Sequence, residues 1–201
     1  MKNIMNQILN TRSKTLFQRI SPFLPIKGQV LDIGCGTGHN AREIRDRTAL
    51  DVYEADVENM KILPPPPIIF NGYDLPFEND SFQCVLLLFV LHYCKDIVSL
   101  LQEIRRVTSG ALIVLQSTYV GIIGKATLQT RDWVEGTLAF YVARLVGLIG
   151  KYPCPLHPRE FLERERLETM FNQAGWSITY FEPQYWPFVK VSRDLYVLGE
   201  Q

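Results

Sequence analysis

Apolar and polar positions follow two alternating periods through the first 115 residues of the chain. Short, almost continuous apolar runs, typical of strands buried on both faces, occur at 29–33, 50–55, 68–70, 82–90 and 111–115. Helical spacing of apolar residues between these runs predicts helices at Asn40–Arg47 and Ile97–Val107, and a helical start near Val57–Leu63. Strands that alternate with crossover helices predict an α/β fold with a mostly parallel sheet.

Both ends of the chain add elements to this unit. Spaced apolar residues from Ile4 to Ile20 predict an amphipathic helix, which the prolines that follow must end, so residues 1–28 are expected to form a helical cover. Pro158–Ala174 has the pattern of a charged amphipathic helix closed by a glycine. Trp176–Glu182 and Leu195–Leu198 are predicted to form a terminal antiparallel pair, which brings the sheet to seven strands.

The pattern changes at residues 121–157, where glycine and tryptophan precede an apolar helix predicted at Leu138–Ile149. We interpret this segment as an insertion in a single domain that spans residues 1–201, and expect it to be a substrate lid. A dimer contact, a membrane-surface helix and ordinary core packing are the alternatives. Arg144 interrupts the apolar run, which is shorter than the roughly 20 residues needed to span a bilayer, so no transmembrane segment is expected.

Composition narrows the classes of partner. Lys plus Arg and Asp plus Glu are equal, at 21 each, so no overall charge favours nucleic acid or an anionic membrane. A small-molecule substrate is expected, with a peptide or carrier-bound acceptor as the alternative, and the oligomeric state stays open. The four cysteines lack the spacing of a metal site or a disulfide scaffold, and residues 1–20 lack a continuous apolar run, so a cytoplasmic protein is expected.

The first predicted strand runs into a turn with glycine at every second position, Gly34-Cys35-Gly36-Thr37-Gly38. Glycine tolerates a positive φ and lets a ligand approach the backbone closely. A dinucleotide site would instead have Gly-x-Gly-x-x-Gly. Asp32, just before the turn, would repel a pyrophosphate but suits the cationic amino group of a methionine moiety. An ordinary strand-to-helix turn is the alternative reading.

This segment resembles motif I of the class I S-adenosylmethionine (SAM) dependent methyltransferases, and the likeness continues downstream. Asp56-Val57-Glu58-Asn59-Met60 resembles the acidic motif whose carboxylate binds both ribose hydroxyls, with Glu54 as the rival acid. Residues 71–82 resemble the adenine-binding loop, although Asn71 and Gln83 stand where the family usually has Asp. Leu88–Tyr93 resembles the Leu-His motif of the ubiquinone, menaquinone and biotin-pathway subgroup, methyltransferase type 11.

The resemblance implies a Rossmann-like doubly wound fold with an antiparallel terminal strand, SAM as cofactor, S-adenosylhomocysteine as product, and no metal. The residues that it implies for cofactor binding are Asp32, Gly34, Cys35, Gly36, Gly38, Asp56, Val57, Asn71, Gly72, Tyr73 and Leu88. His92 and His157 are candidate general bases, because histidine titrates near neutrality. A pocket-shaping role for His92 and a turn role for His157 are the alternatives.

Methyl transfer to a small, partly apolar metabolite is therefore the expected function, with O- or C-methylation favoured. A nucleotide-fold dehydrogenase is disfavoured by the glycine spacing and by the 71–77 loop. A catalytically silent SAM-fold protein that binds a protein partner stays open, since Asn71 and Gln83 depart from the family acids.

Overall fold

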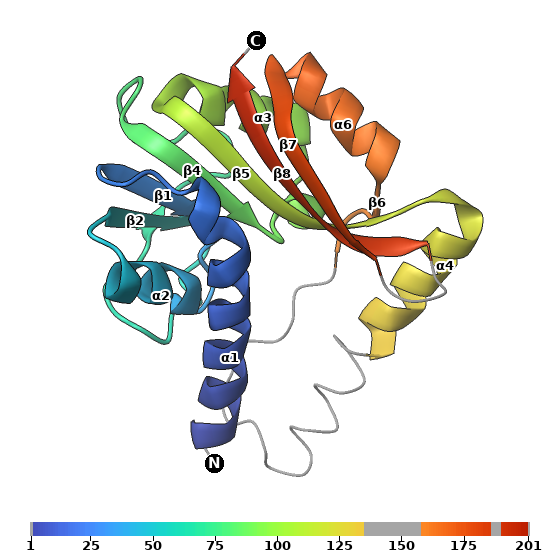
Figure 1. Ribbon diagram of the computed structural model, residues 1–201, viewed down its shortest axis with the longest axis horizontal. Coiled ribbons are helices and arrows are strands. Elements are labelled where there is room, and N and C mark those ends of the chain that lie inside the picture. The colour runs from blue at the N-terminus through green and yellow to red at the C-terminus, as the bar shows by residue number, and fades with distance from the viewer. Residues whose placement is uncertain (1, 135–157, 186–189, 201) are drawn as a thin grey trace.

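The computed structural model describes residues 2–134, 158–185 and 190–200. One twisted sheet runs through the molecule, with helices on both of its faces (Figure 1). Its strand order is β3-β2-β1-β4-β5-β8-β7, and the short β6 pairs with β5 off this path. The strands are β1 Gln29–Ile33, β2 Asp51–Asp56, β3 Ile68–Ile69, β4 Phe82–Leu88, β5 Thr108–Tyr119, β6 Leu162–Glu163, β7 Trp176–Tyr185 and β8 Val191–Glu200.

The described helices form two layers over the sheet. They are α1 Lys2–Ile20, α2 His39–Arg47, α3 Ile97–Val107, α4 Gly121–Arg131 and α6 Arg164–Gln173, with short 3-10 turns η1 Ser21–Phe23 and η2 Leu91–Tyr93. One apolar core joins α3 and α6 to the sheet, and a second joins α1 and α2 to its other face. A sheet covered on both faces explains why the parallel strands read as continuous apolar runs.

The predicted fold class is confirmed, although the sheet has eight strands rather than the seven expected, because the short β6 also pairs with β5. The strands β3, β2, β1, β4 and β5 pair in parallel, whereas β8 pairs antiparallel with both β5 and β7. In parallel strands the carboxyl ends lie at one edge of the sheet, and ligands of open α/β sheets bind outside that edge. The order reverses between β1 and β4, so the glycine turn after β1 lies at the switch point.

The helix predicted near Val57–Leu63 is wrong, since this segment has no helical turn. Lys61 turns inward to Glu54 on β2, and the Ile62 amide bonds to the carbonyl of Thr37 at 3.4 Å. Prolines at 64–67 then remove the donors that a further helical turn would need. Tertiary contacts of the Lys61 side chain therefore replace the local helical pattern.

The predicted helix at 158–174 begins later than expected. Its first part forms β6, whose Leu162 and Glu163 pair with Thr118 and Tyr119 of the unusually long β5, and only Arg164–Gln173 is helical. In the predicted insertion, α4 occupies the first eleven residues. The apolar helix expected at Leu138–Ile149 and the candidate base His157 lie outside the described residues.

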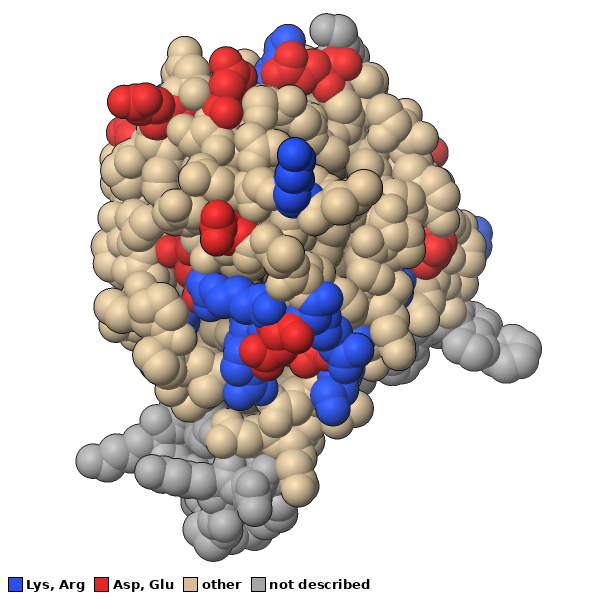
Figure 2. Space-filling model, turned by 60° about the vertical axis from the view of Figure 1, so that its left-hand side comes forward, with Lys and Arg blue, Asp and Glu red and all other residues tan. Residues whose placement is uncertain are grey.

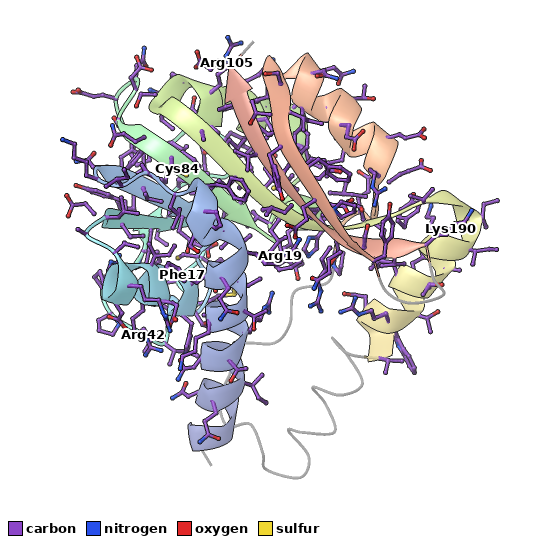
Figure 3. All side chains as sticks on the ribbon, viewed as in Figure 1. Phe17, Arg19, Arg42, Cys84, Arg105 and Lys190 are labelled. Carbon is purple, nitrogen blue, oxygen red and sulfur yellow. The ribbon has the colours of Figure 1, made fainter. Side chains whose placement is uncertain are left out.

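Helix α1 is fixed to the carboxyl-terminal strands by Arg19, which points from the helix toward the sheet (Figure 3). Its guanidinium donates to the Glu182 carboxylate at 2.9 Å and to the carbonyl of Arg193 at 3.2 Å.

Acidic and basic side chains are intermingled on the face seen in Figure 2, in keeping with the equal totals of each sign. None of the described helices has the length and apolar character needed to cross a bilayer.

Candidate active site

A cavity of about 550 Å³ lies where the carboxyl ends of β1, β2 and β4 meet. Eight of the eleven residues expected to bind a cofactor line it, namely Gly34, Gly36, Asp56, Val57, Asn71, Gly72, Tyr73 and Leu88. Asp32, Cys35 and Gly38 are not in its wall. The cavity therefore brings together motifs that are separated by more than fifty residues in the sequence.

The glycine turn needs its lack of side chains for two different reasons. Gly34 has φ +69°, and a Cβ there would come within 2.6 Å of Val90 Cγ2, so packing excludes a larger residue. Gly36 has φ +52°, but an added Cβ would meet nothing within 4 Å. The open space at Gly36 faces the cavity, as close approach of a ligand to the backbone requires.

The two rival acids of β2, Glu54 and Asp56, have different surroundings. Asp56 lines the cavity, where its carboxylate accepts hydrogen bonds from the amides of Gly36 at 2.9 Å and Val57 at 2.8 Å. Glu54 is buried and forms ion pairs with Lys61 at 2.6 Å and Arg45 at 2.7 Å. Gly38 leaves room for this lysine, since a Cβ there would lie 2.7 Å from Lys61 Cε. Asp56 is therefore the acid that a ligand in the cavity can reach.

Asp32 is buried, at 1 % exposure, and its Oδ2 has no hydrogen-bond partner. Desolvation, together with the negative charges of Glu54 and Asp56, raises the pKa of Asp32 to about 8. Desolvation also raises the pKa of the neighbouring Cys35 thiol, which does not favour a nucleophilic role. An orphaned buried carboxyl beside a glycine with open space fits a ligand that brings positive charge to this turn, as the methionine moiety of SAM does.

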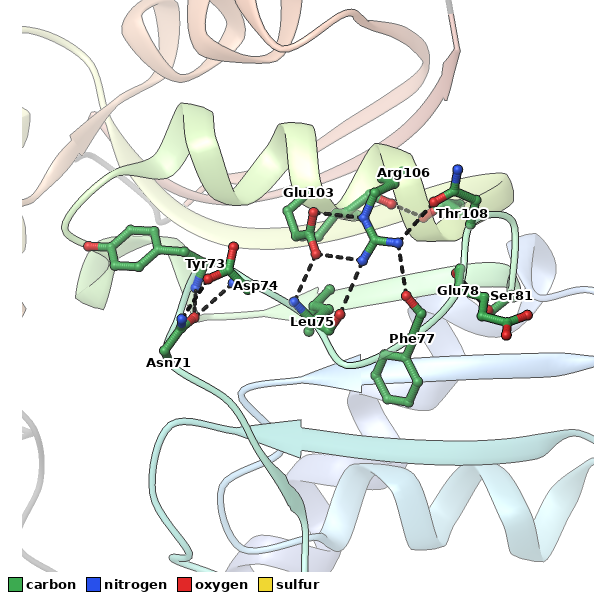
Figure 4. Close-up of polar contacts among 12 residues, drawn as sticks. Asn71, Tyr73, Asp74, Leu75, Phe77, Glu78, Ser81, Glu103, Arg106 and Thr108 are labelled. Atoms are coloured by element: carbon green, nitrogen blue, oxygen red, sulfur yellow. Dashed lines mark hydrogen bonds and ion pairs between the residues drawn. The ribbon is translucent and has the colours of Figure 1, made fainter.

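The loop after β3 is held to α3 by a single arginine (Figure 4). Arg106 donates to the carbonyls of Leu75 and Phe77 at 3.1 and 2.8 Å, and it forms an ion pair with Glu103 at 2.7 Å. Glu103 in turn accepts the amide of Leu75 at 2.8 Å. The loop resembling the adenine-binding segment is thereby ordered by contacts on the side away from Asn71.

Asn71 itself is committed to the turn of this loop. Its Oδ1 accepts the amides of Tyr73 and Asp74, both at 2.8 Å, and its Nδ2 donates to the Asp74 carboxylate at 2.7 Å. Both lone pairs of the amide oxygen are therefore in use, so the expected hydrogen bond from an adenine amino group would require one of them to be released. The backbone amide of Gly72 has no such competitor among the contacts of this loop.

Gln83, the other departure from the family pattern, lies far from this chemistry. It stands at the amino end of β4, where its Oε1 accepts the amide of Gln29 at 2.7 Å. The cavity lies at the opposite, carboxyl edge of the sheet. The missing carboxylate at position 83 therefore leaves the site unaffected.

A second cavity, of about 750 Å³, adjoins the first and shares Arg12, Phe89 and Tyr93 with it. His92 and Gln116 lie in its wall, and Gln116 Nε2 is 2.8 Å from His92 Nδ1. Because an amide NH₂ can only donate, His92 Nδ1 accepts and the ring proton lies on Nε2. Desolvation lowers the pKa of His92 to about 4. This arrangement makes His92 a neutral hydrogen-bond donor and favours the pocket-shaping alternative over a base.

Sequence reasoning missed two residues at the boundary of the cavities. Phe89 has φ +62°, a strained conformation for an aromatic residue, and Arg12 of α1 lies over its ring at 5.1 Å from the centroid. No local signal marks Arg12, because only the packing of α1 brings it to the site. Of the apolar residues Leu16, Phe17 and Ile20 of α1, only Leu16 lines the second cavity, where Ile8 of the same helix joins it. Ile20 is in the core, and Phe17 packs under Arg47.

Among the described ranges, no group of three or more His, Cys, Asp or Glu side chains could hold a metal ion.

Comparison with known proteins finds a methyltransferase domain and several distant relatives. A protein-family model described as "Methyltransferase domain" matches residues 31–114. A malonyl-[acyl-carrier protein] O-methyltransferase of Halorhodospira halophila is 25% identical over 197 residues, which are 92% of this chain and 62% of the relative. The mitochondrial arginine-hydroxylase NDUFAF5 of Danio rerio is 26% identical over 183 residues, 85% of this chain and 53% of the relative. The chain thus spans less than two thirds of the length of these relatives.

Solved structures agree on the fold. A geranyl diphosphate C-methyltransferase from Streptomyces coelicolor, solved with S-adenosyl-L-homocysteine, superposes with a TM-score of 0.67 at 11% identity and covers 94% of this chain and 80% of its own. Residues 31–114 of the chain therefore match the methyltransferase domain, and the chain as a whole has the fold of the SAM-dependent methyltransferases, with a cavity at the carboxyl ends of β1, β2 and β4.

Proposed function

We propose that this protein transfers the methyl group of SAM to a small, partly apolar metabolite, with methylation at oxygen or carbon. The observation that carries the proposal is the pair of adjoining cavities, one with the family motifs in its wall and one lined by apolar side chains together with polar ones. When bound, SAM would supply a methyl group already activated by the sulfonium. The protein would align the donor with the acceptor and exclude water.

Cofactor binding is assigned to residues of the first cavity. Asp56 would accept hydrogen bonds from the ribose hydroxyls, and the amide of Gly72 would donate to a ring nitrogen of adenine. Gly34 and Gly36 would let the methionine moiety lie against the turn, with its amino group toward the uncompensated carboxyl of Asp32. Relatives named for O-methylation of a malonyl carrier and for C-methylation of geranyl diphosphate support a small or carrier-bound acceptor.

The first experiment is isothermal titration of the wild type with SAM and with S-adenosylhomocysteine. Asp56→Ala should weaken binding by on the order of 2 kcal/mol, roughly 30-fold, because the ribose hydroxyls lose an ionised acceptor. Asp51→Ala is the matched control, since Asp51 is an exposed acid at the far end of the same strand. Circular dichroism of each variant verifies the fold. Failure of the wild type to bind either ligand would sink the proposal.

A second function is favoured by one observation, the likeness to a relative named as an arginine hydroxylase. Under this alternative, the protein uses the same fold for a reaction other than methyl transfer, or it binds a protein partner and catalyses no reaction. Formation of S-adenosylhomocysteine in step with a methylated acceptor distinguishes methyl transfer from both of these alternatives.

A further inference from the structure

The second cavity is the place for a methyl acceptor, and its boundary with the first is where a methyl group would pass. Arg12, Phe89 and Tyr93 are the residues common to both walls. Whatever atom receives the methyl group must therefore lie close to these three side chains. This inference rests on the proposed function and deepens it by naming the class of acceptor.

Arg12 is an unusual side chain to find at that boundary. Its side chain is exposed on α1, and it lies in the walls of both cavities. Among the described residues no carboxylate forms an ion pair with it, and its printed neighbour is the face of the Phe89 ring. An arginine in a cavity wall with no acidic partner among the described residues can bind an anionic ligand, and its planar fork matches a carboxylate.

The remainder of the wall supports an anion with an apolar body. Its apolar side chains are Ile8, Leu16, Leu128, Pro158, Phe161 and Leu162. Its charged residues are three arginines, Arg12, Arg131 and Arg193, against a single acid among the described lining residues, Asp132.

The described wall also offers no strong base at the boundary. His92 uses Nδ1 to accept from Gln116 and is held neutral, and burial raises the pKa of Tyr93, which keeps its phenol protonated at neutral pH. An acceptor that already carries its negative charge needs no proton removed.

We propose that the methyl acceptor is a carboxylate attached to an apolar body, and that Arg12 binds that carboxylate at the boundary of the two cavities. One carboxylate oxygen attacks the methyl carbon, an O–CH₃ bond forms, and the S–CH₃ bond breaks with its electron pair passing to sulfur. The carboxylate loses its charge as the sulfonium becomes a thioether, and no proton is released. The neutral ester then no longer pairs with Arg12, which favours its release.

The test compares carboxylates with matched acceptors of the same shape. Octanoate and 4-phenylbutyrate represent free acids, malonyl-N-acetylcysteamine represents a carboxylate on a carrier thioester, and 1-octanol and octylamine are the controls. Methyl esters are identified by the methanol that they release in base, which ethers and methylamines do not. Binding of octanoate is also titrated directly, on protein saturated with S-adenosylhomocysteine, so that affinity is read without turnover.

The variants are Arg12→Gln, Arg12→Lys and, as a control, Lys14→Gln, which removes an exposed charge two residues along the same helix. Arg12→Gln should raise the KM and the Kd for the carboxylate about 30-fold, because an ion-paired hydrogen bond is lost. It should lower kcat much less, because the carboxylate charge is already fading in the transition state. Arg12→Lys should recover part of the affinity, and Lys14→Gln should match the wild type.

The outcomes separate this inference from the proposed function. Ester formation that depends on Arg12, with a rate that is flat from pH 6 to 9, supports both. Transfer to octylamine or 1-octanol but to no carboxylate, or ester formation indifferent to Arg12→Gln, overturns the inference and leaves the methyltransferase proposal standing. Transfer to nothing by a protein that also fails to bind SAM overturns the proposed function itself.

Discussion

Asp32 gives the sharpest test of the physical reasoning, because the structure predicts that removing its charge stabilises the protein. Its carboxyl is buried, one oxygen lacks a partner, and Glu54 and Asp56 are both close enough to repel its ionised form. Asp32→Asn keeps the shape and adds an amide that can donate to these neighbours. We expect the variant to unfold at higher denaturant than the wild type.

The magnitude follows from linkage. The pKa of Asp32 is about 8 in the folded chain and 3.8 at its ordinary value, so between these pH values folding takes up a proton. The free energy of unfolding is therefore highest below pH 3.8, and it falls by about 1.36 kcal/mol per pH unit as the pH rises toward 8. At pH 7 the loss amounts to about 4 kcal/mol, equivalent to roughly 10 °C in Tm for a chain of this size.

Urea unfolding at pH 5, 6, 7 and 8 measures the effect. The advantage of Asp32→Asn over the wild type should grow with pH and level off near pH 8, whereas Asp46→Asn, an exposed acid on α2, should show no such trend. SAM should stabilise the wild type more than Asp32→Asn, since its amino group offsets the buried charge. A variant less stable than the wild type at pH 7, or a difference independent of pH, would refute the reasoning.

Two further substitutions test the surrounding structure. Arg164→Met should lower the free energy of unfolding by about 3–5 kcal/mol, because it leaves the fully buried carboxylate of Asp194, which Arg164 contacts at 2.9 Å, without its ion-pair partner. Arg166→Met removes an exposed ion pair and should cost under about 1 kcal/mol in the same urea unfolding. Equal losses in the two variants would contradict this expectation. Gly34→Ala should lower the Tm, because the added methyl group clashes with a neighbouring valine. Gly36→Ala should have a Tm closer to that of the wild type but should bind SAM more weakly in titration. A lower Tm for Gly36→Ala with unchanged SAM affinity would show that the open space at Gly36 is not where the ligand lies.

The sequence was most informative where local pattern and tertiary role coincide. The buried strands read as apolar runs because both faces of the sheet are covered, and the glycine turn was visible because it needs a residue type at fixed spacing. The helix expected at Val57–Leu63 failed because Lys61 is drawn to Glu54, a contact between different elements. Arg12 could not be found at all, since nothing within α1 distinguishes it from the other cations there.

Candidate roles divided in the same way. Spacing alone could not decide whether Glu54 or Asp56 faces the ligand, because the two acids occupy alternate positions on one strand. The structure decides it, since Glu54 is buried in ion pairs with two cations. His92 lies in the wall of the second cavity, and burial there lowers its pKa although its hydrogen bond with Gln116, a residue 24 positions later, acts in the opposite direction. Properties that depend on partners from distant elements need the fold.

The position of β8 has a consequence for how the chain folds. This strand lies between β5 and β7, so the sheet closes only when residues 191–200 insert beside a strand that begins more than eighty residues earlier. Until then β5 presents a long, apolar, unpaired edge, the kind of template on which chains aggregate. During synthesis, β1 to β5 can assemble as the ribosome releases them. If the ribosome stalls before residue 191, the apolar edge of β5 stays unpaired and exposed to solvent.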